Sequence, residues 1–151
     1  MGYTGQPVRR FEDARLVSGQ GSYVDDIKIP GMLHAAFLRS PHAHARIRSV
    51  DVTAAQEMPG VEAVLTGEDI LGIVPDLPTR SMSGEWEVDE FNAPEHPALA
   101  VGKVSYVGQT VAVVVAQDPG RARDALELIQ VDYEPLPVVL DPWEAASPAS
   151  I

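Results

Sequence analysis

Histidine is the residue type in this chain with the clearest chemical potential. His42 and His44 stand two residues apart, and on a strand such a pair points to one side, so the two imidazoles could chelate a metal with His34 nearby in sequence. However, no Asp or Glu lies between His34 and Arg46 to complete a ligand set, and three neighbouring arginines would repel a cation. The alternative is that these imidazoles hydrogen-bond backbone groups at a turn or a subunit contact. We expect no metal site here.

Other patterns that carry chemistry are missing from the sequence. With no cysteine, the chain offers no thiolate ligand for zinc or iron–sulfur clusters and no cysteine nucleophile. The segment Gly19-Gln20-Gly21 lacks both the third glycine and the following helix of a dinucleotide cradle, and no Gly-x-Ser-x-Gly elbow occurs. Carboxylates cluster between Asp76 and Glu95, which indicates solubility more than acid–base catalysis. We therefore expect no catalytic and no cofactor-binding residue.

Composition narrows the class of protein. A chain of 151 residues fits one domain, and 45% hydrophobic with 22% charged residues is typical of a globular protein. No apolar run approaches the 18 residues of a membrane span and no signal segment opens the chain, so we expect a cytoplasmic protein without membrane insertion. The net charge of −11 disfavours nucleic acid. The first 50 residues are mildly basic, which suits either an acidic partner or plain solvation.

The N-terminal half predicts an arm followed by strands. Residues 1–30 mix charges with turn formers and predict an extended arm that ends at Pro30-Gly31. Residues 32–39 are apolar nearly throughout, which predicts a strand buried on both faces. Residues 45–52 alternate imperfectly and predict a strand with a bulge or twist. Thr53 and Gln56 match a capping box, which predicts a helix of about two turns, and residues 61–66 predict the next strand.

The C-terminal half predicts a central strand and an amphipathic helix. Residues 110–116 are dense in β-branched side chains, and Gly108 just before them predicts a bend, bulge or hairpin. Asp118 as N-cap and Pro119 at the first position predict a helix whose apolar residues face a sheet. Residues 131–140 contain two prolines and predict an edge-type or irregular strand, before a frayed tail at 146–151.

Residues from about 75 to 97 are rich in Pro, Ser, Gly and acidic residues. Their apolar residues follow neither the helix period nor the strand period, so the segment predicts a long surface loop. Trp86 and Phe91 lie in it. Either both rings fold back onto this domain, or the loop is ordered by a neighbour. Together these elements indicate one domain over residues 31–145 with a strand-rich core.

Several ordered strings carry a family resemblance. They are Arg10 to Leu16, Gly19 to Asp26, Pro30 to Ala36, Arg39 to Ala45, Pro59 to Val61, Val64 to Gly67, Tyr106 to Val114 and Val131 to Pro137. In order and spacing they resemble the opening of the large subunit of molybdenum hydroxylases, the family of carbon monoxide dehydrogenase, xanthine dehydrogenase and aldehyde oxidase. The resemblance covers residues 7–145. It implies an α+β fold, a single a/b hammerhead-like domain with a mixed or antiparallel sheet packed against one or two helices.

The resemblance also implies a role. Such enzymes hydroxylate or oxidise a small substrate, such as carbon monoxide, an aldehyde or an N-heterocycle, with water as oxygen source. They use molybdopterin, two [2Fe-2S] clusters and FAD, all held by later domains of the large subunit or by iron–sulfur and FAD subunits, so no catalytic residue maps onto this chain. We expect a structural or assembly domain; the alternative is a detached protein-interaction module.

One departure from the family stands in the Tyr106 to Val114 string. Gln109-Thr110 replaces the frequent Glu-Pro, so a charge contact is not expected at Gln109, and Thr110 keeps a strand donor that proline would lack. Within the assembly hypothesis, we expect eight residues to contact another domain or subunit: Arg39, Ser40, Pro41, His42, His44, Trp86, Phe91 and Gln109.

Overall fold

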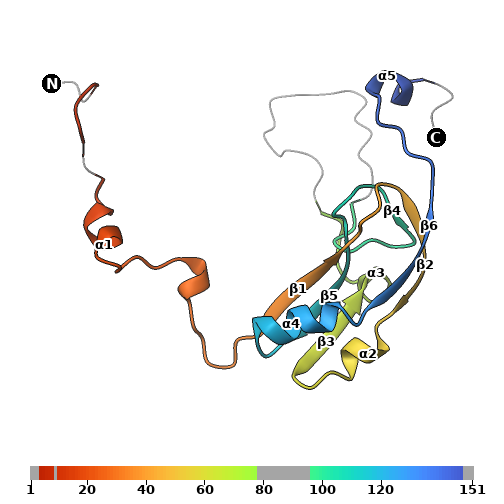
Figure 1. Cartoon of the computed structure of the whole chain (residues 1–151), viewed down its shortest axis with the longest axis horizontal. Coiled ribbons are helices and arrows are strands. Elements are labelled where there is room, and N and C mark those ends of the chain that lie inside the picture. The colour runs from red at the N-terminus through yellow and green to blue at the C-terminus, as the bar shows by residue number, and fades with distance from the viewer. Residues whose placement is uncertain (1–3, 9, 78–95, 148–151) are drawn as a thin grey trace. The chain divides into compact units, whose positions relative to one another are not determined.

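The computed structural model describes residues 4–8, 10–77 and 96–147 and divides the chain into two units, Met1–Met32 and Leu33–Ile151. The expected loop contacts of Trp86 and Phe91 lie outside the described residues, as does the end of the predicted tail. Among the described residues, the larger unit holds six strands and a helix, α4, that packs on some of them (Figure 1).

The smaller unit contains two short helical segments, α1 (Asp13–Val17) and the 3-10 turn η1 (Val24–Asp26). The expectation of an extended arm is therefore wrong at these two segments. In η1 the Asp26 carboxylate accepts a hydrogen bond from the backbone N–H of Tyr23 at 2.9 Å, which favours a turn over an extended chain. Neither segment buries a residue.

Three strands form an antiparallel sheet, here called sheet A, in the order β1-β5-β3. Their bounds are β1 (His34–Arg39), β5 (Thr110–Ala116) and β3 (Val61–Thr66). The prediction of a central strand at 110–116 is confirmed. The prediction that the first strand is buried on both faces is wrong for this chain, because β1 is an edge strand whose residues alternate between half-buried and exposed.

Three further strands form a second antiparallel sheet, sheet B, in the order β4-β2-β6. Their bounds are β4 (Lys103–Val104), β2 (Ala45–Asp51) and β6 (Gln130–Pro135). The bulge expected in β2 is confirmed by a register shift between Ile47 and Ser49. The expected continuation of β6 to residue 140 is wrong, because strand pairing ends at Pro135 and the next proline lacks a ladder donor.

Helix α4 (Pro119–Leu126) begins as the sequence predicts. The Asp118 carboxylate accepts a hydrogen bond from the N–H of Arg121 at 2.9 Å, with proline at the first helical position. The helix packs on β1 and β5 and buries Ala122 and Ala125. Because the residues that α4 buries are small alanines, the helix can lie close against sheet A (Figure 1).

Three single-turn helices complete the larger unit: α2 (Thr53–Gln56), α3 (Gly67–Ile70) and α5 (Pro142–Ala145). The capping box predicted for Thr53 is wrong. The carboxylate of Asp51 accepts from the Thr53 N–H at 3.0 Å instead, Val52 is the N-cap, and the helix has one turn only. Helix α5 places a turn where the sequence predicted only the end of the domain before a frayed tail.

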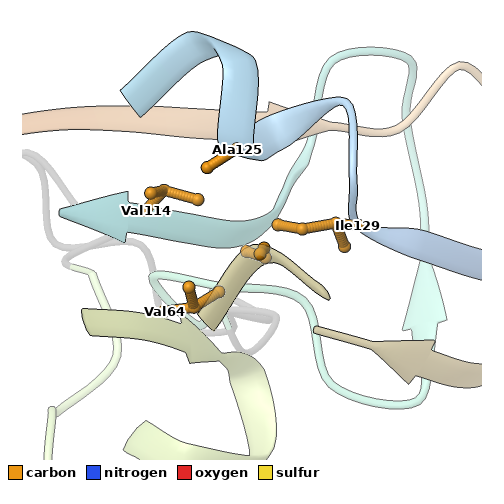
Figure 2. Close-up of a cluster of buried hydrophobic side chains, with 6 residues drawn as sticks. Val64, Val114, Ala125 and Ile129 are labelled. Atoms are coloured by element: carbon orange, nitrogen blue, oxygen red, sulfur yellow. The ribbon is translucent and has the colours of Figure 1, made fainter. Parts of the chain in front are cut away.

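Two apolar clusters form the core. The first joins Val64 on β3, Val114 on β5 and Ala125 on α4, with Ile129 from the segment between α4 and β6 (Figure 2). The second packs Val111 of sheet A against Ala45 and Val104 of sheet B. The α+β prediction is confirmed, in its antiparallel form, with the strands divided between two sheets.

Candidate functional site

The connection from β1 to β2, residues 40–44, is held in one conformation by hydrogen bonds. Ser40 is 2% exposed; its N–H donates to the Gln109 carbonyl at 2.9 Å and its carbonyl accepts from the Gly108 N–H at 2.8 Å. The Ser40 Oγ also accepts from the N–H of His42 at 3.0 Å. These hydrogen bonds thus fix the backbone from which the side chains of His42 and His44 extend.

The turn that receives Ser40 spans residues 106–109. Gly108 adopts a φ of +89°, which L side chains rarely adopt, and the Gln109 N–H donates to the Tyr106 carbonyl at 3.2 Å. The bend predicted at Gly108 is confirmed. Arg39 Nη1 donates to the Gly108 carbonyl at 2.9 Å, so the guanidinium closes the turn from the β1 side.

Gln109 is the member of the predicted contact set that the structure explains most fully. The residue is 8% exposed, and its Oε1 accepts from the N–H of Ser105 at 2.7 Å. A neutral amide suits this place, because a buried charge would need further partners. Gln109 therefore stabilises the domain's own turn.

The two histidines contact different groups on β6 and the segment that follows it. The His42 ring lies 4.9 Å from the Tyr133 ring, centroid to centroid, with the planes tilted by 56°. His44 Nδ1 lies 2.6 Å from the Pro137 carbonyl oxygen, and the His44 carbonyl accepts from the Leu136 N–H at 2.9 Å. His42 and His44 thus connect the residues just before β2 to β6 and to the segment that follows β6.

Tyr133 is a residue of this region that sequence reasoning missed. It packs into the second apolar cluster, and burial raises the pKa of the Tyr133 hydroxyl, offset in part by the side chain of Ser40. Val131 and Tyr133 alternate with polar residues on β6, and this alternation was the signal in the sequence that Tyr133 faces inward. The aromatic pair with His42 depends on strand pairing across most of the chain.

The surface beside His44 is basic. An open depression of about 400 Å³ is lined by His44, Arg46, Gly102, Lys103 and Leu136. Arg46 and Lys103 are direct neighbours across β2 and β4. Like charges in such a pair repel each other and any cation. Among the described residues, no group of three or more His, Asp or Glu could hold a metal ion.

The part of the chain that the structure describes does not form a holder for a molybdenum–pterin group either. A cradle needs glycines whose missing Cβ admits a ligand, but a Cβ on the buried Gly67 would meet the chain's own Ala100 carbonyl. Gly19 and Gly108 stand at open turns. No chemical step can be derived through that group from these residues. Within the same ranges, no helix has the length and apolar character to cross a membrane.

Comparison with known proteins decides the family. Residues 18–137 match the model described as aldehyde oxidase and xanthine dehydrogenase, a/b hammerhead domain. The chain belongs to this family. The resemblance drawn from the sequence is thereby confirmed, and the hammerhead domain of this chain comprises sheets A and B with the helices between their strands.

The relatives are much longer than this chain. It is 47% identical to the carbon monoxide dehydrogenase large chain of Afipia carboxidovorans, covering 93% of this chain and 16% of that one. It is 38% identical to the xanthine dehydrogenase molybdenum-binding subunit of Escherichia coli, covering 91% and 18%. The structure of quinoline 2-oxidoreductase from Pseudomonas putida 86 matches with a TM-score of 0.80 and 46% identity, over 91% and 17%.

Proposed function

We propose that this chain is the structural hammerhead domain of the molybdenum-binding large subunit of a molybdenum hydroxylase, and that it has no catalysis of its own. The observation that carries the proposal is its coverage: the chain aligns over more than nine-tenths of its length to large chains of such enzymes, yet spans only 16% to 18% of them. The domain would therefore support chemistry located elsewhere in the polypeptide or complex.

The proposed enzyme oxidises or hydroxylates a small substrate such as carbon monoxide, an aldehyde or an N-heterocycle. Molybdopterin would supply that reaction with water as oxygen source, and [2Fe-2S] and FAD subunits would carry the electrons away. Its partners are the remaining domains of the large subunit and those two subunits, in the cytoplasm. The names of the relatives support the molybdenum assignment.

Purification of the assembly tests this function. The chain, affinity-tagged, is co-expressed with the neighbouring coding regions of its own genome. We expect it to copurify with the rest of the large subunit, with stoichiometric molybdenum by elemental analysis and with dye reduction by one of the three substrate classes. A chain that stays monomeric and free of molybdenum would overturn the proposal in favour of a detached interaction module.

The same assembly would use the connection from β1 to β2 as a contact. Pro41 is exposed at its apex, Arg39 is exposed beside it, and the connection is rigid because Ser40 is pinned to the turn at Gln109. Rigid exposed connections bind with little loss of conformational entropy. Trp86 and Phe91 are proposed for the same role from the sequence.

Three variants test this contact: Pro41→Glu, His42→Ala and His44→Ala. The histidines also contact Tyr133 and Pro137 within the chain, so the stability of each variant is measured first. Pro41→Glu leaves both of these contacts in place and probes the surface itself. We expect a lower yield of assembled complex for all three at a temperature where each chain is folded. Wild-type yields throughout would rule this contact out.

A further inference from the structure

The outer face of sheet A carries apolar side chains and lacks a covering layer among the described residues. The strand register places Phe37 and Leu65 on either side of Val113, and Ala35 and Ala63 on either side of Val115. Directly paired residues point to the same face of a sheet, so these six residues form one surface. We call them the outer apolar face.

The opposite face of the same sheet is covered along its central strand. Ala112, Val114 and Ala116 of β5 are each 0% exposed, and α4 and α2 pack over them. On the outer face, Phe37 is 48% exposed and Leu65 is 37% exposed. Only Val111, at one end of β5, is covered on the other side, by Ala45 and Val104 of sheet B.

This asymmetry conflicts with the amino-acid pattern of the strands. Antiparallel strands with one face in water alternate apolar and polar residues, whereas strands apolar on both faces are typical of sheets with a layer on each side. Strand β5 is apolar at every position from Val111 to Ala116, and β1 is apolar from Ala35 to Leu38. The strands therefore have the composition of a sheet covered twice, and the described residues of the domain supply one cover.

We infer that the outer apolar face is the docking surface for the remainder of the large-subunit polypeptide, through an apolar segment of that remainder. This inference rests on the proposed function. More than four-fifths of the length of the relatives' large chains lies outside the region matched here, and that part is long enough to supply a covering layer. The face is also continuous with the second apolar cluster at Val111, so a docked segment would extend an existing core.

The test is a pair of variants, Phe37→Glu and Leu65→Glu, in the chain co-expressed with the remainder of the large subunit. Both side chains are already partly exposed, so the isolated variants should fold. The matched control is Leu71→Glu, since Leu71 is an apolar residue of the same unit, 61% exposed and outside the face. We expect at least a tenfold loss of complex for each face variant and less than a twofold change for the control.

Footprinting of the wild-type proteins supplies a second readout. Hydroxyl-radical oxidation of Phe37 and Leu65 should fall several-fold on assembly, while that of Leu71 should not. Assembly that is normal in the face variants, with no protection of either side chain, would overturn the inference and leave the proposed function intact. Failure of the wild-type chain to assemble would instead count against the proposed function.

Two other occupants have distinct signatures in the isolated chain. A wild-type dimer in sedimentation analysis that Phe37→Glu dissociates would replace the inference with self-association. Protection of Phe37 and Leu65 in a monomer would show that another segment of this chain covers the face, which would also overturn it.

Discussion

The Nδ1 atom of His44 lies 2.6 Å from the carbonyl oxygen of Pro137, 93 residues further along the chain. The contact connects the start of β2 to the segment that leaves β6. Because the Pro137 carbonyl accepts, Nδ1 carries the proton of this hydrogen bond. A residue that suggests metal chemistry in the sequence is thus part of the domain's internal bonding.

Replacement of His44 by alanine should lower the free energy of unfolding. The lost hydrogen bond is exposed, with only His44 itself half-buried, which predicts a decrease toward the lower end of about 0.5–1.5 kcal/mol. Urea denaturation followed by circular dichroism measures it. His34→Ala is the control, because no side-chain hydrogen bond is found for His34 within the described ranges, and an equal loss in both variants would contradict the role of the bond.

Asp118→Ala should destabilise α4 and with it the cover of sheet A. The substitution removes the acceptor of the Arg121 N–H, and losing such a cap costs about 0.5–2 kcal/mol. Asp118→Asn keeps an acceptor and should lose less. Asp124→Ala, at an exposed position of the same helix, is the control. Chemical denaturation of all three variants ranks their free energies of unfolding. If Asp118→Asn lost as much stability as Asp118→Ala, the cap would be excluded as the cause.

Asp69 should contribute to the dependence of stability on pH. Hydrogen bonds from the Thr66 side chain and backbone N–H, both at 2.7 Å, hold the pKa of Asp69 below its usual 3.8. A pKa lowered by folding stabilises the folded state above the unfolded-state pKa, and this contribution is lost as the pH falls through the folded-state pKa.

The variant Asp69→Asn should therefore be less stable than wild type near neutral pH, and the difference should shrink below about pH 4. Urea denaturation at a series of pH values measures the difference. Glu68→Gln, at the neighbouring exposed position, should give a difference that hardly varies with pH. A gap for Asp69→Asn that stays constant down to acid pH would refute the linkage.

Gly67→Ala should destabilise the junction of β3 and α3. Gly67 is buried, and a Cβ there would overlap the backbone carbonyl of Ala100, which cannot rotate away as a side chain would. Overpacking of this kind costs about 1–3 kcal/mol. Thermal unfolding measures the loss, with Glu68→Ala as the exposed neighbour. Stability equal to wild type would mean that the segment around Ala100 moves freely.

Local features were predictable where a few adjacent residues decide them. The Asp118 cap, the bulge in β2 and the central position of β5 depend on short patterns, and the structure has all three. The capping box predicted for Thr53 failed because Asp51 accepts the Thr53 N–H that the side chain of Gln56 would have to bind. The division into two sheets was not predictable, because strand patterns do not state which strands pair.

The proposed site shows the same limit. Ser40, His42, His44 and Gln109 were singled out as a surface for partners, and the structure shows the contacts that they make within this domain. The ring contact of His42 with Tyr133 and the hydrogen bond of His44 to Pro137 join residues that are distant in sequence, and only the folded backbone brings them together.

The sequence by itself determined the family, the α+β class and the two-faced apolar character of β1 and β5, since these follow from residue types at short spacing. Tertiary structure alone decided that α4 covers one face of sheet A and that the other face carries no such cover within the part of the chain that the structure describes. The physical reason is that the residue pattern of a strand shows that both of its faces are apolar, whereas the element that packs on each face depends on contacts between distant segments.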